Sequence, residues 1–244
     1  MDDMIKRLQK LSTSIRLKVD SYLPRHCLLC QQSNVYSSLC SSCLQDLPVT
    51  PHGCDICGQA IANLSQPICG SCLSRPPKYT KAVAAFDYSF PVTTILQALK
   101  YQDKGHWAHP IAKAAYNSFT ASFAHLTNAR LIPVPMHTSQ YQHRRDNHAE
   151  LLCRYLSLHS GLPMLKNHII KHRATQRQAG LSAKARARNL KGSFSLRTVP
   201  PDYPIILVDD VMTTGSTLNI LADLLQHAGI REVYGFAIAR KSLI

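Results

Sequence analysis

Apolar positions from residue 81 onward alternate between short β-rich runs and longer stretches with helical spacing. Strands are expected at 81–88, at 130–132, from 205 up to an acid pair, and at 232–239. Between them the apolar spacing predicts helices at about 91–101, 107–125, 147–159 and 216–228. This part of the chain therefore reads as an α/β domain.

The N-terminal part follows a different pattern. Residues 1–23 place apolar side chains at three- and four-residue steps among lysines and arginines, which predicts an amphipathic basic helix. It could lie on a membrane surface or on DNA, but packing against the next module is favoured, because the apolar stripe is narrow and lacks aromatic residues. The stiff run Arg75-Pro76-Pro77-Lys78 places the expected boundary between domains 1–76 and 77–244.

Cysteines dominate the chemistry of the first domain. They form four Cys-x-x-Cys pairs: Cys27 and Cys30, Cys40 and Cys43, Cys54 and Cys57, and Cys69 and Cys72. Each pair places two thiolates at the spacing that a tetrahedral zinc ion needs, so two closed structural Zn²⁺ sites are expected. Sequential pairing and a cross-braced pairing of the first pair with the third both fit the spacing. A thioredoxin-type redox role is disfavoured because such motifs occur singly.

Composition and charge indicate the size of the core, the cellular location and the class of ligand. The 244 residues, 45% of them hydrophobic, can build a sizeable core. The sequence has no apolar run of transmembrane length and no signal-peptide pattern, so we expect a cytoplasmic protein. The formal net charge of +14 favours polyanions, which means either nucleic acid or a multiply charged phosphate substrate.

The most informative stretch begins at the strand from Ile205. Its apolar run leads into Asp209 and Asp210, and a small hydroxyl-rich turn follows before a helical pattern: Thr213, Thr214, Gly215, Ser216 and Thr217. A helix N-terminus offers unpaired N–H groups to a phosphate, and carboxylates at the end of a strand can accept hydrogen bonds from vicinal sugar hydroxyls. Phosphate and ribose recognition together predict a ribose 5-phosphate site.

This stretch lacks the lysine of a Walker A loop and the spacing of a dinucleotide fingerprint. It resembles the phosphoribosyl-pyrophosphate (PRPP) loop of the type I phosphoribosyltransferases over its whole length. The resemblance implies that Asp209 and Asp210 hold the ribose hydroxyls, and that residues 213–217 hold the 5-phosphate.

Residues elsewhere in the chain are candidates for binding pyrophosphate or for forming a lid over it. In the type I fold the loop after the first core strand receives pyrophosphate, which here indicates Met136, His137 and Arg144, although a solvated basic turn fits equally well. Residues 151–201 contain ten Lys or Arg and no acid, and the segment 171–194 is long enough to act as a lid or to contact nucleic acid. A solvated basic surface is the simpler interpretation of that segment. The remaining candidates are Lys100, Gln176, Arg186 and Asn189.

Taken together, the chain resembles the ComF family of competence-associated proteins, including its GntX-type members. The resemblance rests on the four cysteine pairs, the 209–217 loop, Leu99-Lys100-Tyr101, Pro133-Val134-Pro135, Asn147-x-Ala149-Glu150-Leu151-Leu152, Thr175-Gln176, Leu181, Arg186, Asn189, Gly192 and Phe194. One departure is Arg144-Arg145-Asp146-Asn147, where members usually carry Arg-Gly-Phe-Asn.

The resemblance implies an architecture and two functions. The architecture is an N-terminal double zinc ribbon followed by a type I phosphoribosyltransferase-like domain, a parallel sheet flanked by helices. The first function is that of a phosphoribosyltransferase-like protein that binds PRPP with Mg²⁺ and acts in DNA uptake, natural transformation or DNA utilisation. The alternative is a non-catalytic adaptor that binds single-stranded DNA or a DNA-uptake helicase. The sequence assigns no catalytic residue and no acceptor base.

Overall fold

The computed structural model describes residues 26–33, 38–50, 53–61, 65–102, 104–137, 147–172 and 192–241. The chain divides into two compact units, Met1–Leu47 and Pro48–Ile244. The second group of cysteines belongs to the larger unit. The domain boundary expected between residues 76 and 77 stays a prediction, and the expected helix at 1–23 lies outside the described residues.

The described part of the first unit is built around its cysteines. Cys27, Leu39 and Cys40 are buried together, and Leu28, Leu29 and Cys43 pack against them. The short helix α2 (Ser41–Gln45) begins at Cys40, whose sulfur accepts a hydrogen bond from the Cys43 backbone N–H. The fold of this small unit therefore depends on the residues that would hold a metal.

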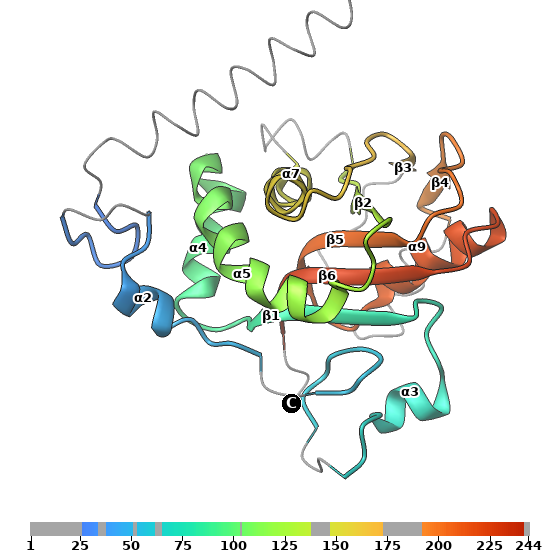
Figure 1. The fold of residues 1–244 in the computed structure, drawn as a ribbon, viewed down its shortest axis with the longest axis horizontal. Coiled ribbons are helices and arrows are strands. Elements are labelled where there is room, and N and C mark those ends of the chain that lie inside the picture. The colour runs from blue at the N-terminus through green and yellow to red at the C-terminus, as the bar shows by residue number, and fades with distance from the viewer. Residues whose placement is uncertain are drawn as a thin grey trace, which may run out of the picture. The chain divides into compact units, whose positions relative to one another are not determined.

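The larger unit is organised on a four-stranded parallel sheet in the order β1-β6-β5-β2 (Figure 1). The strands are β1 (Lys81–Asp87), β2 (Arg130–Pro133), β5 (Ile205–Met212) and β6 (Val233–Arg240). All eight residues of β6 are buried, as expected for an inner strand of a parallel sheet. The α/β fold class and the parallel sheet that the sequence predicts are confirmed.

Helices connect and cover the strands. They are α4 (Val92–Tyr101), the 3-10 turn η1 (Gly105–Trp107), α5 (Ala108–Phe123), α7 (His148–Ser160) and α9 (Ser216–His227). The four α-helices lie close to their predicted ranges, because the apolar spacing in these stretches is regular, whereas η1 was not predicted. No helix among the described residues is long and apolar enough to cross a membrane.

Residues on β6 show how the two faces of the sheet are covered. Phe236 packs edge-on against Phe119 and Phe123 of α5. Its neighbour Gly235 points to the opposite face, since side chains alternate along a strand. A Cβ atom at Gly235 would lie 2.6 Å from Leu218 Cδ1, so α9 approaches the sheet closely there. Helix α5 thus covers one face and α9 the other.

Three short elements complete the described fold. Strands β3 (Ile169–Lys171) and β4 (Phe194–Leu196) pair antiparallel in a separate two-stranded sheet. The short helix α3 (Gly70–Ser74) carries Cys72. Strand β4 was not predicted, because three residues at the end of a basic segment carry too little pattern.

Strand β5 continues beyond the point that the sequence indicates. The apolar run ends at Val208, but pairing with β6 continues through Asp209 opposite Ala237 and Met212 opposite Arg240. The two acids therefore lie in the second half of an ordered strand rather than in a loop. Their backbone is held by the neighbouring strand, which restricts where the carboxylates can point.

Candidate functional site

The loop after β5 leads directly into the N-terminus of α9. Gly215 precedes the helix with φ of +72°, a left-handed conformation that favours glycine. The Thr214 and Ser216 hydroxyl oxygens lie 2.6 Å apart, and the Ser216 N–H donates to Thr214 Oγ1 at 3.4 Å. The first turn of a twelve-residue helix thus presents N–H and hydroxyl groups in one small turn. Such a turn can bind a phosphate group.

The acid pair lies at the carboxyl end of β5. The Asp210 backbone N–H donates to Asp209 Oδ1 at 2.8 Å. Lys100, on the last turn of α4, places Nζ 2.9 Å from Asp210 Oδ2. Only 17% of the Lys100 side chain and 18% of the Asp210 side chain are exposed, so water screens this pair less than an ordinary surface pair.

The two acids have different electrostatic surroundings. Burial and the adjacent charge of Asp210 raise the pKa of Asp209 to about 7. Burial acts to lower the pKa of Lys100, but attraction to Asp210 outweighs it and the Lys100 pKa is raised. Lys100 therefore stays charged against Asp210, whereas Asp209 can gain or lose a proton near neutral pH.

A second lysine at the site was not singled out from the sequence. Lys171 ends β3, and its ammonium lies 5.7 Å from the centre of the Phe194 ring. Burial lowers the pKa of Lys171, and the charge of Asp209 partly opposes this shift. The segment 171–194 is basic throughout, so only the fold could distinguish this lysine from its neighbours.

The predicted pyrophosphate residues are described in part. Met136 and His137 follow β2, both partly exposed, and His137 Nε2 lies 2.9 Å from the His172 carbonyl oxygen. The loop after β2 thus contacts the end of the β3 strand. Arg144, Gln176, Arg186 and Asn189 lie outside the described residues, so their roles stay predictions.

The family motif at Asn147 has a structural explanation. Asn147 caps α7, accepting from the Ala149 N–H at 3.1 Å and donating to the Val134 carbonyl at 3.2 Å. Glu150 in the first turn pairs with Lys166 at 2.7 Å. Asn147 thus joins α7 to the turn after β2, and the Glu150–Lys166 pair joins α7 to the segment before β3.

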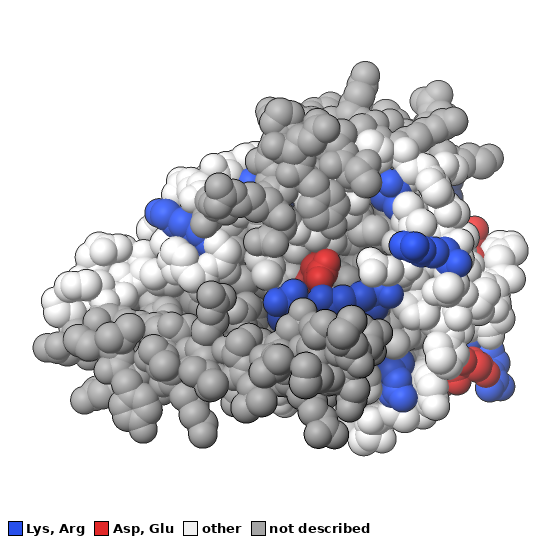
Figure 2. Space-filling view, turned by 90° about the horizontal axis from the view of Figure 1, so that it is seen from above, with Lys and Arg blue, Asp and Glu red and all other residues white. Residues whose placement is uncertain are grey.

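The charge of the described surface is uneven. On the face that Figure 2 shows, basic side chains lie in several separate places and acidic ones are fewer. This agrees with 28 Lys and Arg against 14 Asp and Glu in the whole chain. Anionic ligands are therefore attracted to the protein at long range, and salt weakens this attraction.

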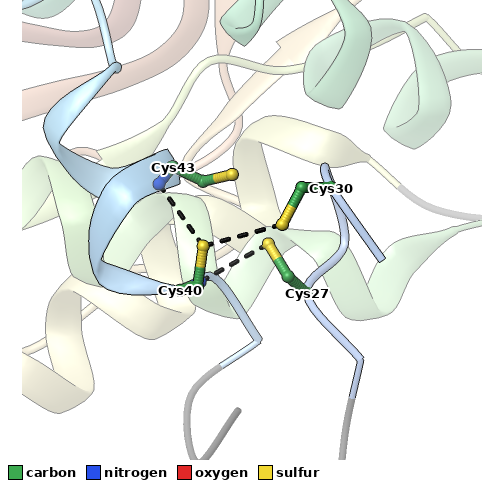
Figure 3. Close-up of side chains that lie close together, drawn as sticks. All are labelled: Cys27, Cys30, Cys40 and Cys43. Atoms are coloured by element: carbon green, nitrogen blue, oxygen red, sulfur yellow. Dashed lines mark hydrogen bonds between the residues drawn. The ribbon is translucent and has the colours of Figure 1, made fainter. Parts of the chain in front are cut away.

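The first four cysteines form one cluster. Figure 3 shows the side chains of Cys27, Cys30, Cys40 and Cys43 converging, with the first two on one turn and the last two at the start of α2. Cys30 Sγ and Cys40 Sγ are 3.7 Å apart, and all four sulfurs lie within 4.8 Å of one another. Four thiolates about 2.3 Å from a tetrahedral zinc would be about 3.8 Å apart, so the cluster fits Zn²⁺.

Cys54, Cys57, Cys69 and Cys72 form the second cluster with the same design, and Cys57 Sγ lies 3.8 Å from Cys69 Sγ. The pairing is therefore sequential, which decides between the two arrangements that the spacing allowed. In each cluster the sulfur of the first cysteine accepts from a backbone N–H of the third: Cys40 N–H donates to Cys27, and Cys69 N–H donates to Cys54. Burial opposes ionisation of Cys27 and Cys54, but several backbone hydrogen bonds outweigh it. Those from Cys30 and Cys40 lower the pKa of Cys27 to about 6, and those from Cys69 and Cys57 lower the pKa of Cys54 to about 7.

The first cysteine turns of the two clusters differ in the residue that follows their second cysteine. Gln31 and Gly58 each follow the second cysteine of a pair with positive φ, +62° and +68° respectively. At Gly58 a Cβ atom would lie 3.0 Å from the Ala82 carbonyl oxygen. Glycine is needed in the second turn because β1 lies directly against it.

Two further residues near the site were missed from the sequence. Tyr79 is 5% exposed, and a Cβ atom at Gly215 would come within 2.9 Å of its hydroxyl oxygen. Arg240, 4% exposed, donates to the Cys57 carbonyl oxygen at 2.7 Å. A tyrosine before a strand and an arginine at the end of an apolar strand carry no local signal for such contacts.

We expect the purified protein to contain about two Zn²⁺ per chain, measured by elemental analysis and native mass spectrometry. Cys30→Ser and Cys69→Ser should each lower the content to about one, because each removes a ligand from a different cluster. Cys153→Ser, at a buried cysteine outside both clusters, should leave it at two. A folded, metal-free wild-type protein would contradict the assignment.

Comparison with known proteins agrees with these observations. The family model of the double zinc ribbon domain matches residues 18–73, which include both clusters. Among solved structures, the purine phosphoribosyltransferase from Pyrococcus horikoshii covers 55% of this chain and 86% of that chain at 13% identity. Its TM-score is 0.34. The parallel strand order of this chain defines its fold class.

Curated relatives match most of the chain. Competence protein F of Haemophilus influenzae is 34% identical over 210 residues, which are 84% of this chain and 91% of that protein. The DNA utilization protein YhgH of Salmonella typhimurium is 31% identical over 223 residues, 89% of this chain and 98% of that protein. Similarity of this extent shows that the chain belongs to the ComF family, with Competence protein F and YhgH.

Proposed function

We propose that this protein binds PRPP, or a related phosphoribosyl ligand, together with Mg²⁺, and acts in DNA uptake or DNA utilisation. The observation that carries the ligand is the succession of an acid pair, a hydroxyl-rich turn and a helix N-terminus at the carboxyl end of β5. The names of the relatives, Competence protein F and DNA utilization protein YhgH, support the cellular role.

Each part of the ligand has matching groups in this proposal. The 5-phosphate accepts hydrogen bonds from the N–H and hydroxyl groups of residues 213–217, and the helix dipole of α9 favours its charge. The ribose hydroxyls donate to Asp209 and Asp210. Mg²⁺ binds in proteins through carboxylates and substrate phosphates, and this acid pair offers carboxylate oxygens beside the loop.

The two lysines fit the remaining part of the ligand. Loss of pyrophosphate from the ribose builds negative charge on the departing group, and fixed cations stabilise such charge. Lys100 is held in place by Asp210, and Lys171 lies close enough for the charge of Asp209 to act on it. Within this proposal, positioned charges rather than a covalent nucleophile support any transfer reaction.

Within this proposal, single-stranded DNA is the polyanionic partner that the DNA role implies, and a DNA-uptake helicase is a second expected partner. The net charge of +14 supplies the long-range attraction. The alternative, an adaptor without catalysis that binds single-stranded DNA or the helicase and merely retains the phosphoribosyl site, is not favoured. The acceptor of a phosphoribosyl group is left unassigned.

Calorimetric titration of the zinc-replete protein with PRPP and Mg²⁺ tests the ligand. We expect binding that Asp209→Ala combined with Asp210→Ala weakens at least about 100-fold, since a hydrogen bond to a charged group contributes about 1.5–3 kcal/mol. Asp202→Ala combined with Asp223→Ala removes the same charge at exposed positions and should leave the affinity within about twofold. No binding by the wild type would refute the proposal.

The raised pKa of Asp209 predicts a pH dependence. A carboxyl with a pKa of about 7 is mostly protonated at pH 6 and mostly ionised at pH 8, and the ionised form is the better acceptor for ribose hydroxyls. Affinity for ribose 5-phosphate should therefore rise about tenfold from pH 6 to pH 8 beyond the change seen with Asp209→Asn. The variant corrects for ionisation of the ligand's phosphate. Equal pH dependence in both proteins would contradict the assignment.

Salt dependence tests the DNA partner. Fluorescence anisotropy with a single-stranded oligonucleotide should show affinity falling at least about tenfold between 50 and 200 mM KCl, as expected for several phosphate contacts. Asp209→Ala combined with Asp210→Ala should keep this binding, because the attraction comes from basic residues. A complex that is absent or insensitive to salt would count against DNA as a partner.

A further inference from the structure

The second cysteine cluster lies in the same compact unit as the phosphate loop, whereas the first cluster belongs to the other unit. Cys54, Cys57 and Cys72 are buried in one hydrophobic cluster with Tyr79, with Met212 at the end of β5 and with Leu218 in the first turns of α9. The Ala82 N–H of β1 also donates to the Ile56 carbonyl at 2.7 Å. The second cluster is thus packed into the core beneath the loop.

Arg240 is the charged link in this packing. Its Nη1 donates to the Cys57 carbonyl at 2.7 Å, Nε and Nη2 donate to Gln59 Oε1 at 3.1 and 3.0 Å, and Nη2 lies 4.0 Å from Cys57 Sγ. Zn²⁺ with four thiolates carries a net charge of about −2, and a buried charge needs an opposite charge or hydrogen bonds nearby. The guanidinium meets this need from outside the ligand set.

The backbone of Arg240 leads directly to the phosphate loop. Arg240 ends β6 opposite Met212, the residue before Thr213. The next residue, Lys241, donates its N–H to the Met212 carbonyl at 2.9 Å. A shift of Arg240 that follows loss of metal would therefore move the strand end from which the loop begins.

Tyr79 provides a second link. Its hydroxyl oxygen lies against Gly215, and no side chain larger than hydrogen fits between them. The same side chain packs in the hydrophobic cluster with Cys57 and Cys72. Tyr79 thus lies between the metal cluster and the turn that would hold the 5-phosphate.

We propose that the second zinc cluster is a structural part of the phosphoribosyl site, with Arg240 and Tyr79 as positioning residues, so that zinc in this cluster and a ribose 5-phosphate group on the loop bind cooperatively. The first zinc cluster takes no part in this coupling. The inference rests on the proposed function, because it concerns the ligand of the same loop. Such coupling is reciprocal: the ligand must retain the metal as strongly as the metal supports the ligand.

The two clusters make an internal control. Cys30→Ser leaves zinc only in the second cluster, and Cys69→Ser leaves it only in the first. Zinc transfer from each full-length variant to a chromogenic chelator is timed with and without saturating ribose 5-phosphate, which requires no Mg²⁺. We expect the ligand to slow release at least about fivefold in the Cys30→Ser protein. In the wild type, timed in the same way and with its ligand site intact, the release phase that Cys30→Ser removes should keep its rate.

The link itself is tested in the Cys30→Ser background. Arg240→Lys keeps the charge but loses the forked donors, and it should speed zinc release at least about tenfold without ligand and abolish the slowing by ligand. Arg231→Lys makes the same change at an exposed arginine paired with Asp202 and should alter neither. If Arg240→Lys does not fold, Tyr79→Phe is used instead. It removes only the hydroxyl at Gly215 and should reduce the slowing by ligand at least about threefold.

The outcomes separate the two proposals. Calorimetric binding of ribose 5-phosphate by the wild type, without an effect on zinc release from either cluster or with an equal effect on both, overturns the coupling and leaves the proposed function standing. No binding of ribose 5-phosphate or PRPP overturns both. Unchanged zinc release in a folded Arg240→Lys protein overturns the role of Arg240.

Discussion

The parallel pairing of β5 with β6 is the interaction on which the candidate site depends. It continues past the apolar part of β5 to Met212, so Asp209 and Asp210 belong to an ordered strand. Because the acids and the following turn are joined to a held strand end, the α9 N-terminus is presented in one direction. The same pairing places Arg240 beside the start of the turn. If β5 paired with β6 over fewer residues, the positions of the acids and of the loop relative to each other would not be fixed.

Charge at the site is balanced by residues from distant parts of the chain. Lys100 comes from α4 and pairs with Asp210, and Lys171 comes from β3 and lies within the field of Asp209. Two adjacent carboxylates in a partly buried position repel each other, and this repulsion adds to burial in raising the pKa of Asp209. The lysines limit that repulsion. The site therefore combines one firmly paired acid with one whose charge depends on pH.

The two cysteine clusters have the same chemistry in different surroundings. In each, a backbone N–H from the third cysteine supports the sulfur of the first, and a residue with positive φ follows the second. The first cluster is surrounded by a small set of apolar residues, Leu28, Leu29 and Leu39 among them. The second is part of a core that includes strands and α9. A repeated motif thus supports a small unit in one case and contributes to a large one in the other.

The α/β class, the order of the main helices and strands, the eight cysteine ligands and the residues of the 209–217 motif could all be predicted from the sequence. These features are local: apolar spacing, Cys-x-x-Cys pairs and a continuous motif are all read within a few residues. Asp209 and Asp210 could be named, but that they continue a strand could not, since pairing with β6 overrides the end of the apolar run.

Three features became visible in the folded chain alone: how the cysteines pair, that Lys100 reaches Asp210, and that Tyr79 and Arg240 lie between the second cluster and the loop. Each of these contacts joins residues far apart in the chain. Arg240 and Cys57, for example, are hydrogen-bonded although they are 183 positions apart in the sequence. Composition and spacing describe what a segment can do, whereas such contacts arise from the packing of a shared core, which no single segment specifies.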